Sequence, residues 1–418
     1  MKSATMTSRA ALADGHGGFV LEDIQVHPPG PEEVRVRLAA SGLCHTDHDS
    51  MGWGRPLVLG HEGAGMVESV GAGVTHVVQG DRVLLNWAIS CGSCFQCQHG
   101  NHALCEKHSP VAGVESKGGH AHSLATTLGD RPVERSFHLG TLSEWTVVRK
   151  EAVIKLPEDI PWASACILGC GVMTGFGSVV NAAKVQLGQS VVVLGCGGVG
   201  LNVIQGARIA GACPIIAVDV LPKRLEMATL FGATHTIMGD KGDVSLQSVT
   251  QEVRALTDQR GADVAFEATA NPALGEAPLR LVRHGGKAVQ VSGIEEVVSM
   301  DMRLFEWDKT YLNPLYGKCF PERDFPILFE HYRQKRLLLD ELVSGVYSLD
   351  ELSDAFAHML EGRNAKGVVQ LIPESPDGPF GSKSGKQSLP SKVDLLFFSA
   401  LCFTLQSEER GGSPSSSA

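Results

Sequence analysis

The sequence lacks the features of a membrane protein, a secreted disulfide-rich protein or a nucleic-acid binder. Its longest late apolar run, 395–405, is well short of the roughly 20 residues that span a bilayer. Eleven cysteines in 418 residues are too few for a disulfide scaffold, and the N-terminus has no apolar core of signal-peptide length. A net charge of −10 argues against nucleic acid or an anionic membrane as the main partner. We expect a cytoplasmic protein that binds neither.

The composition is that of a globular protein with two ordinary domains. Hydrophobic residues make up 43% of the chain and charged residues 20%. The 48 glycines fit a turn-rich β region together with a nucleotide fold.

The segment 191–219 has the most informative local pattern. It contains, in order, a strand-like run at 191–194, glycines Gly195, Gly197 and Gly200, a helix-like period at 201–210, a second run at 215–218 and Asp219. The glycines permit a tight turn, a close approach of pyrophosphate to the backbone, and close packing of the helix on the sheet. The helix N-terminus offers free N–H groups to phosphates. Asp219 lies where an acid accepts hydrogen bonds from an adenosine ribose. The segment predicts a dinucleotide site, with NAD favoured because a carboxylate repels a 2′-phosphate; a plain structural βαβ unit is the alternative.

Periodicity predicts different architectures on the two sides of residue 172. Alternation at 34–38, with many Gly and Pro turns, favours a small barrel of antiparallel strands over the first 85 residues. Further elements are predicted as strands at 263–268, 288–292 and 367–372 and as helices at 223–231, 246–256 and 349–360.

Three separated residues form a candidate catalytic metal site. Cys44 lies in GLCHTD, His61 in GHEGAG and Cys170 in LGCGVMTG. Each alone is more often a packed core residue. Together they supply two thiolates and one imidazole, a ligand set of catalytic zinc that leaves the fourth position open.

Four cysteines form a second candidate metal site. Cys91, Cys94, Cys97 and Cys105 have the spacing C-x₂-C-x₂-C-x₇-C. Four thiolates within fifteen residues can close around one structural zinc. An iron–sulfur cluster is the alternative, and a disulfide pair is less favoured.

These motifs together resemble those of the zinc-dependent medium-chain alcohol dehydrogenases. The matching segments are GLCHTD, LGHEGAG, the four-cysteine loop, LGCGVMTGFG and VVVLGCGGVG, in the family's order, over about residues 8–373. The resemblance implies an α/β fold, with a Rossmann-type doubly wound parallel sheet at 172–315 and a GroES-like β-barrel catalytic domain at 1–171 and 316–373. It also implies two Zn²⁺ per chain, NAD, and a homodimer or homotetramer. Sugar and polyol dehydrogenases usually have a carboxylate where Cys170 stands, which favours the alcohol branch.

Residues 374–418 lie beyond the family's usual end. They are rich in Pro, Gly and Ser and then apolar. We expect a disordered appended tail without catalytic residues; a docking segment is the alternative.

The resemblance implies catalytic roles for residues next to the zinc ligands. Thr46 would hydrogen-bond the substrate oxygen and begin a proton relay. The family's relay histidine corresponds to Asp49, and His48 stands one residue earlier, so His48, Asp49 and water all stay open as carriers. Asp47 and Glu62 would orient the ligands and tune their charge.

Cofactor contacts are implied in the same way. His45 would contact the pyrophosphate, Lys366 takes the place of a phosphate-binding arginine, and Thr174 and Val199 would pack against the nicotinamide. The other implied cofactor residues are Gly195, Gly197, Gly198 and Gly200 in the turn and Asp219, Lys223 and Arg224 near the ribose.

The implied substrate is a primary alcohol or aldehyde, aromatic or medium-chain. Trp87 would narrow the inner pocket, and 137–141, which includes Leu139, resembles the family's strand beside it. Ser109 stands where glutathione-dependent relatives have an arginine, which disfavours the glutathione adduct. Two alternatives are open: a thiol-dependent formaldehyde dehydrogenase, and a catalytically silent NAD-binding sensor or scaffold.

Overall fold

The computed structural model describes residues 4–113 and 125–372. The predicted tail, 374–418, lies outside them. The described residues fall into two compact units. The first contains 4–113, 125–182, 197–202 and 314–372; the second contains 183–196 and 203–313.

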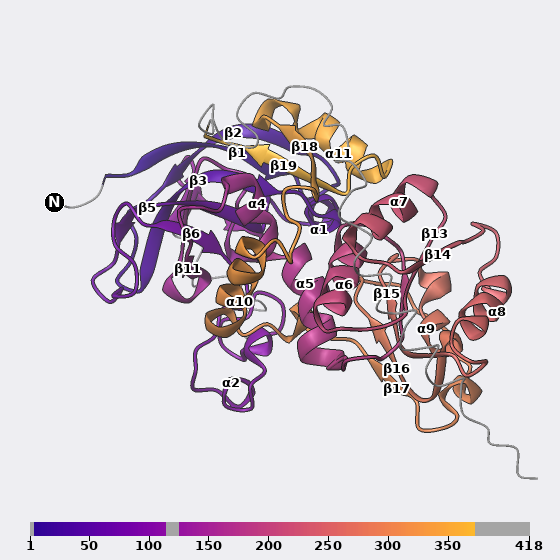
Figure 1. The fold of residues 1–418 in the computed structure, drawn as a ribbon. Coiled ribbons are helices and arrows are strands. Elements are labelled where there is room, and N and C mark those ends of the chain that lie inside the picture. Colours follow the sequence, from indigo (N-terminus) through magenta and orange to yellow (C-terminus); the bar gives the residue numbers. More distant parts are fainter. Residues whose placement is uncertain (1–3, 114–124, 373–418) are drawn as a thin grey trace, which may run out of the picture. The chain divides into compact units, whose positions relative to one another are not determined.

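The first unit is built on two largely antiparallel sheets (Figure 1). One has the order β8-β7-β2-β1-β4-β9, and the other has the order β11-β6-β5-β3-β19-β18, with β10 also paired to β3. The strands are β1 (Met6–Ala13), β2 (Phe19–Val26), β3 (Glu33–Gly42), β4 (Leu57–Val58), β5 (Glu62–Val70), β6 (Arg82–Leu85), β7 (Thr126–Leu128), β8 (Arg131–Pro132), β9 (Glu134–Arg135), β10 (Trp145–Arg149), β11 (Val153–Lys155), β18 (Val343–Tyr347) and β19 (Lys366–Gln370). The helices are α1 (His45–Asp49), α2 (Phe95–Gln98), α4 (Trp162–Cys166), α5 (Gly171–Gly177), α10 (Pro321–Arg333) and α11 (Leu352–Leu360).

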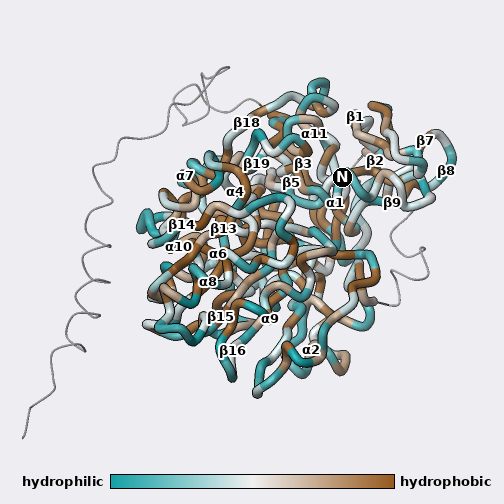
Figure 2. The backbone as a smooth tube through the Cα atoms, turned by 90° about the vertical axis from the view of Figure 1, so that its right-hand side faces the viewer, coloured by the Kyte–Doolittle hydropathy of each residue, from teal (hydrophilic) through white to brown (hydrophobic). Residues whose placement is uncertain are grey.

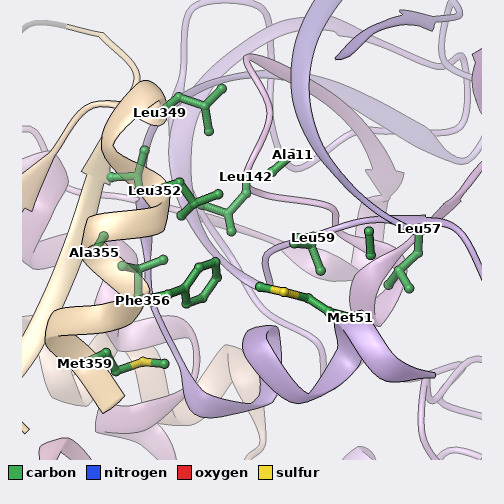
Figure 3. Packing of buried hydrophobic residues seen from close by; sticks show 13 residues of the cluster. Ala11, Met51, Leu57, Leu59, Leu142, Leu349, Leu352, Ala355, Phe356 and Met359 are labelled. Carbon is green, nitrogen blue, oxygen red and sulfur yellow. The ribbon is translucent and has the colours of Figure 1, made fainter. Parts of the chain in front are cut away.

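The amphipathic helix α11 supplies one face of a core cluster in this unit. Figure 3 shows Leu352 and Phe356 of α11 directed toward Leu142 and Met51. Burial of each such side chain stabilises the fold by about 1.5–3 kcal/mol. A capping box precedes the helix, because the Ser348 backbone N–H donates to a Glu351 carboxylate oxygen at 2.8 Å. The predicted helix at 349–360 therefore begins with a 3₁₀ turn, Leu349–Glu351.

The second unit is built on one parallel sheet with the order β14-β13-β12-β15-β16-β17. Its strands are β12 (Val191–Leu194), β13 (Ile215–Asp219), β14 (His235–Met238), β15 (Ala262–Glu267), β16 (Val282–Gln290) and β17 (Thr310–Leu312). Its helices are α7 (Pro222–Phe231), α8 (Gln247–Ala255) and α9 (Ala277–Leu281), together with the C-terminal part of α6 (Gly198–Ile209). All residues of β12 and β13 are buried, as in a parallel sheet with both faces covered. The predicted α/β class is confirmed.

Two segments differ from the prediction. The strand expected at 137–141 is wrong: Ser136–His138 is a 3₁₀ turn, and Phe137 and His138 have left-handed φ values of 52° and 60°. A backbone with these left-handed φ values is not extended, so it cannot form a strand. The segment before it has little periodicity in the sequence, yet it contains the short strands β7, β8 and β9, and the hairpin of β7 and β8 is largely hydrophilic (Figure 2). Such polar edge pairs leave little periodicity for the sequence to reveal.

Within the described ranges, no single helix has the length and apolarity to cross a membrane. One pair of helices, bent by 55° at Cys170, meets the length and composition test together.

Candidate metal and cofactor sites

Pairing of β3 with β5 brings the predicted catalytic ligands together. The register sets Gly42 opposite Glu62, so Cys44 and His61, which flank this pair, become neighbours. Cys170 joins them at the N-terminus of α5. One ligand atom each from Cys44, His61, Glu62 and Cys170 lies within 4.8 Å of the others.

The His61 ring is fixed at one nitrogen and available at the other. Its Nδ1 lies 2.7 Å from Asp47 Oδ1, and Asp47 Oδ2 accepts the Cys44 backbone N–H at 3.0 Å. His61 Nε2 is buried and has no hydrogen-bond partner among the described residues. An acceptor on Nδ1–H sets the tautomer in which Nε2 carries a lone pair. This unpartnered nitrogen beside two thiol groups fits a zinc ion.

Charge at the cluster is unevenly divided between the two thiols. A hydrogen bond from Cys170 lowers the pKa of Cys44 well below its usual value, and His61 acts in the same direction. The hydrogen bond to Cys44 and burial raise the pKa of Cys170 well above its usual value. Burial lowers the pKa of His61, but Asp47 and Cys44 outweigh it and raise that pKa, so a metal ion bound at Nε2 would displace a proton from it. Cys44 is therefore the more readily ionised thiol, which suits a metal ligand.

A buried ion pair lies against this cluster. Lys366 Nζ donates to Glu62 Oε1 at 2.6 Å and to the Leu43 carbonyl at 2.8 Å. Burial raises the pKa of Glu62 to about 7, although Lys366 opposes the shift. Lys366 is only 7% exposed, and its ammonium is directed to Glu62; its contact with a phosphate stays a prediction.

The four predicted cysteines also meet at one point. The sulfurs of Cys91, Cys94, Cys97 and Cys105 lie within 4.8 Å of one another. The intervening chain forms α2 and the 3₁₀ turn His102–Leu104. This compact loop arranges four sulfurs as a structural zinc site requires.

Backbone N–H groups point at these sulfurs. Cys91 N–H donates to Cys105 Sγ at 3.3 Å, Cys94 N–H to Cys91 Sγ at 3.3 Å, and Glu106 N–H to Cys94 Sγ at 3.4 Å. Burial raises the pKa of Cys91, but donors led by the Ser93 N–H outweigh it and lower that pKa to about 6. Donors that stabilise thiolates are the expected surroundings of a metal-bound set.

Asp219 accepts backbone hydrogen bonds from the glycine turn and from the residues that follow β13. Its Oδ2 accepts the Cys196 N–H at 2.8 Å and its Oδ1 accepts the Leu221 N–H at 3.0 Å. Arg224 Nη1 lies 3.7 Å from Asp219 Oδ2, whereas Lys223 is exposed. Gly195 has φ +88°, and a Cβ there would lie 2.9 Å from the Ala268 carbonyl, so this turn requires glycine.

The remaining cofactor candidates lie in two helices of the first unit, α5 and α6. Gly198, Val199 and Gly200 begin α6 directly after Gly197, and Thr174 lies in α5. A Cβ at Gly198 would meet the Ala365 carbonyl at 2.9 Å. Gly197, Gly198, Val199 and Thr174 are partly exposed, as a cofactor contact requires.

Helix α1 carries the relay candidates. Cys44 Sγ donates to Thr46 Oγ1 at 3.7 Å, so the hydroxyl adjoins the cluster. His45 is exposed. His48 is 40% exposed, with Nδ1 3.5 Å from an oxygen of Asp49, which is 60% exposed. Either residue can exchange protons with solvent.

Aromatic rings line the region around His61. Trp87 stacks on Tyr316 with centroids 3.8 Å apart and meets Phe137 edge-on at 5.2 Å. Phe137 also packs against His61 at 4.7 Å. Leu139, the other predicted pocket residue, is fully buried. The sequence placed 137–141 beside the pocket but did not predict the contact of Phe137 with His61, and it gave no indication of Tyr316.

The matches to known proteins cover both units. The family model described as "Alcohol dehydrogenase GroES-like domain" matches residues 30–158, and "Zinc-binding dehydrogenase" matches residues 198–329. The chain is 34% identical over 377 residues to "Alcohol dehydrogenase-like 6" of Arabidopsis thaliana, covering 88% of this chain and 96% of that protein. It is 35% identical over 378 residues to "Probable S-(hydroxymethyl)glutathione dehydrogenase 1" of Schizosaccharomyces pombe, covering 88% and 98%.

A solved structure agrees in fold. The benzyl alcohol dehydrogenase of Acinetobacter calcoaceticus aligns with a TM-score of 0.78 and 31% identity, covering 87% of this chain and 99% of that one. On these matches the chain belongs to the zinc-dependent medium-chain alcohol dehydrogenase family and is an oxidoreductase of it.

Proposed function

We propose that the protein is an NAD-dependent alcohol dehydrogenase that interconverts a primary alcohol and its aldehyde at a zinc ion held by Cys44, His61 and Cys170. The convergence of these three residues within 4.8 Å carries the proposal. The unpartnered His61 Nε2 supports it, because a silent sensor or scaffold has no chemical need for such a ligand set.

Bound zinc would act as a Lewis acid toward the alcohol or carbonyl oxygen. Cys44 and Cys170 supply negative charge, and Asp47 fixes the His61 ring. Thr46 can hydrogen-bond the substrate oxygen and pass its proton toward solvent, with His48, Asp49 or water as the next carrier. The buried Glu62–Lys366 pair tunes the charge beside the ligands.

The glycine turn and Asp219 would hold NAD, which would supply the hydride acceptor. The Asp219 carboxylate at the end of β13 would accept a ribose hydroxyl, the role of an acid at this position in dinucleotide folds. Arg224 is the better placed of the two basic candidates for an adenosine contact, because it lies beside Asp219.

A second zinc at Cys91, Cys94, Cys97 and Cys105 would be structural, with an iron–sulfur cluster as the alternative occupant. We further propose a GroES-like domain at 1–171 and 316–373 and a Rossmann domain at 172–315, a homodimer or homotetramer, and a cytoplasmic location.

An aromatic primary alcohol is the preferred substrate. The partly exposed ring of Phe137 offers flat apolar surface beside His61, and the buried ring of Trp87 packs edge-on against it. A solved relative of 31% identity is a benzyl alcohol dehydrogenase. Planar substrates gain from stacking on such rings.

A thiol adduct of formaldehyde is the second candidate, because a relative of 35% identity is named an S-(hydroxymethyl)glutathione dehydrogenase. The position of Ser109 argues against glutathione as that thiol. It is fully buried, and its hydroxyl donates to the Ala103 carbonyl at 2.8 Å, so it cannot take the place of an exposed cationic anchor.

Turnover of benzylic, straight-chain and secondary alcohols with NAD⁺, with zinc measured on the same sample, tests the proposal. We expect the highest kcat/KM for a benzylic alcohol and two zinc ions per chain. Formaldehyde with and without added thiols tests the second candidate: a thiol-dependent rise of kcat/KM by orders of magnitude would replace our first choice. Absence of turnover with every alcohol, at one zinc per chain, would favour the silent NAD-binding protein.

A further inference from the structure

Phe137 packs on the imidazole proposed as a zinc ligand. The ring centroids of Phe137 and His61 lie 4.7 Å apart with planes inclined by 31°. Trp87 and Trp53 meet Phe137 from other directions, at 5.2 and 6.2 Å. The hydrogen bond to Asp47 sets the tautomer of His61 but acts at one point of the ring. The contact of Phe137 along the imidazole face limits rotation of the ring about its hydrogen bond to Asp47.

The segment after Phe137 is hydrogen-bonded to the backbone just before His61. Thr141 N–H donates to the Gly60 carbonyl at 3.0 Å, and Leu142 N–H donates to the Leu59 carbonyl at 2.9 Å. Gly60 has φ +95°, and a Cβ at Gly60 would lie 2.3 Å from Leu142 N. Only glycine before His61 permits this approach, so the position of Phe137 beside the imidazole is specified by the fold.

The left-handed backbone at 137–138 directs the Phe137 ring. Phe137 and His138 have φ values of 52° and 60°, which residues other than glycine rarely adopt. Leu139 N–H and Gly140 N–H both donate to the Ser136 carbonyl, at 2.9 and 3.1 Å, and hold the turn. An extended backbone here would send side chain 137 in a different direction.

We propose that Phe137 is a positioning residue: its ring holds the His61 imidazole at the rotation in which Nε2 faces Cys44 and Cys170. The inference rests on the proposed zinc function of these three residues. It assigns to Phe137 an effect on how long and in what geometry the metal is held, separate from any contact with substrate.

Metal release and the ligand field test the inference without reference to turnover. We would follow zinc release to a chromogenic chelator from wild type, Phe137→Leu and Phe137→Tyr. The kinetic phase that is missing in Cys170→Ala is the release from the catalytic site. The visible spectrum of the Co²⁺-substituted protein reports ligand geometry. Phe95→Leu is the control for the catalytic-site phase and its Co²⁺ bands alone, because Phe95 also packs on a histidine, His99, at 4.0 Å but is 60% exposed and lies in the four-cysteine loop.

Phe137→Leu should release the catalytic metal at least about tenfold faster and shift the Co²⁺ bands, in line with the effect of residues that support ligands. Phe137→Tyr, which keeps the ring face, should have the release rate and the Co²⁺ bands of wild type, and Phe95→Leu should match wild type at the catalytic site. If Phe137→Leu does not fold, Phe137→Met removes the ring in the same way. Unchanged release and spectrum in a ring-deleted variant would overturn the inference alone. A wild type that holds metal only at the four-cysteine cluster would overturn the proposed function as well.

Discussion

Replacement of Lys366 by methionine should destabilise the protein strongly, and the loss should depend on pH. Lys366 and Glu62 form a pair at 2.6 Å whose side chains are 7% and 0% exposed. Removal of one partner from a buried ion pair costs about 3–5 kcal/mol. We expect a loss of that size in the free energy of unfolding at pH 8 for Lys366→Met.

The pH dependence follows from the pKa of Glu62. Burial raises that pKa from 4.5 to about 7 while Lys366 lowers it, so the substitution raises it further. A carboxyl whose pKa is higher in the folded state than in the unfolded state loses stability as pH rises between the two values. In wild type this loss is complete just above pH 7, whereas in Lys366→Met it continues to higher pH. The difference between the proteins should therefore be smaller at pH 5.5 than at pH 8.

Urea unfolding of zinc-loaded protein, followed by tryptophan fluorescence at both pH values, measures the effect. Lys155→Met is the matched control: its ammonium lies 2.7 Å from Asp81 but is 63% exposed, so its loss should cost less than about 1 kcal/mol. The double variant Glu62→Gln, Lys366→Met should regain part of the loss. Equal, pH-independent losses in Lys366→Met and Lys155→Met would refute the reasoning.

Three further predictions concern the metal, the cofactor and the sheet. Cys170→Ala should abolish turnover yet bind NADH almost as wild type in a fluorescence titration; full turnover would contradict the zinc assignment. Asp219→Gly should lower kcat/KM for NAD⁺ by about tenfold or more, the value of one hydrogen bond to a charged group, and reduce discrimination against NADP⁺; an unchanged cofactor ratio would count against the ribose contact. Asp263→Asn should cost about 1–3 kcal/mol at pH 7, measured by urea unfolding. Burial raises the pKa of Asp263, but the Ser190 N–H and hydroxyl and Arg283 outweigh it and lower the pKa. This stabilisation is present above pH 3.8 and is lost as pH falls through the lower folded value, so the two proteins should converge in acid.

Local patterns predicted the central strands and helices α6 to α8 of the second unit, but not β14, β17 or α9. The strand expected at 215–218 is β13, Ile215–Asp219, and the helix expected at 223–231 is α7, Pro222–Phe231. A parallel sheet is buried on both faces, so its strands are continuous apolar runs that a sequence displays directly. The glycine turn is equally local, because the left-handed φ at Gly195 is a property of one residue.

The metal ligands were recognised by motif, but their meeting depends on long-range pairing. The register of β3 on β5 sets Gly42 opposite Glu62 and so joins Cys44 to His61. No spacing in the sequence encodes that register. The same holds for Phe137, whose contact with His61 depends on the bonds of Thr141 and Leu142 to the 59–60 backbone.

Lys366 shows why a residue's neighbours can differ from those its motif suggests. The motif indicates a phosphate contact for this position. In the fold, β19 pairs with β3 so that Val368 lies opposite Gly42, and Leu43 N–H donates to the Gly367 carbonyl at 2.9 Å. Because of this pairing, the Lys366 ammonium contacts the Leu43 carbonyl and Glu62, next to the thiols of Cys44 and Cys170. A buried ammonium with a buried carboxylate is stable only as a pair, so any contact of Lys366 with a phosphate must be made without the loss of Glu62. An anion that drew Lys366 away would leave Glu62 unpaired and favour its protonation; binding of NAD should then take up protons in wild type but not in Glu62→Gln, a difference that calorimetry in two buffers of unequal ionisation enthalpy can detect.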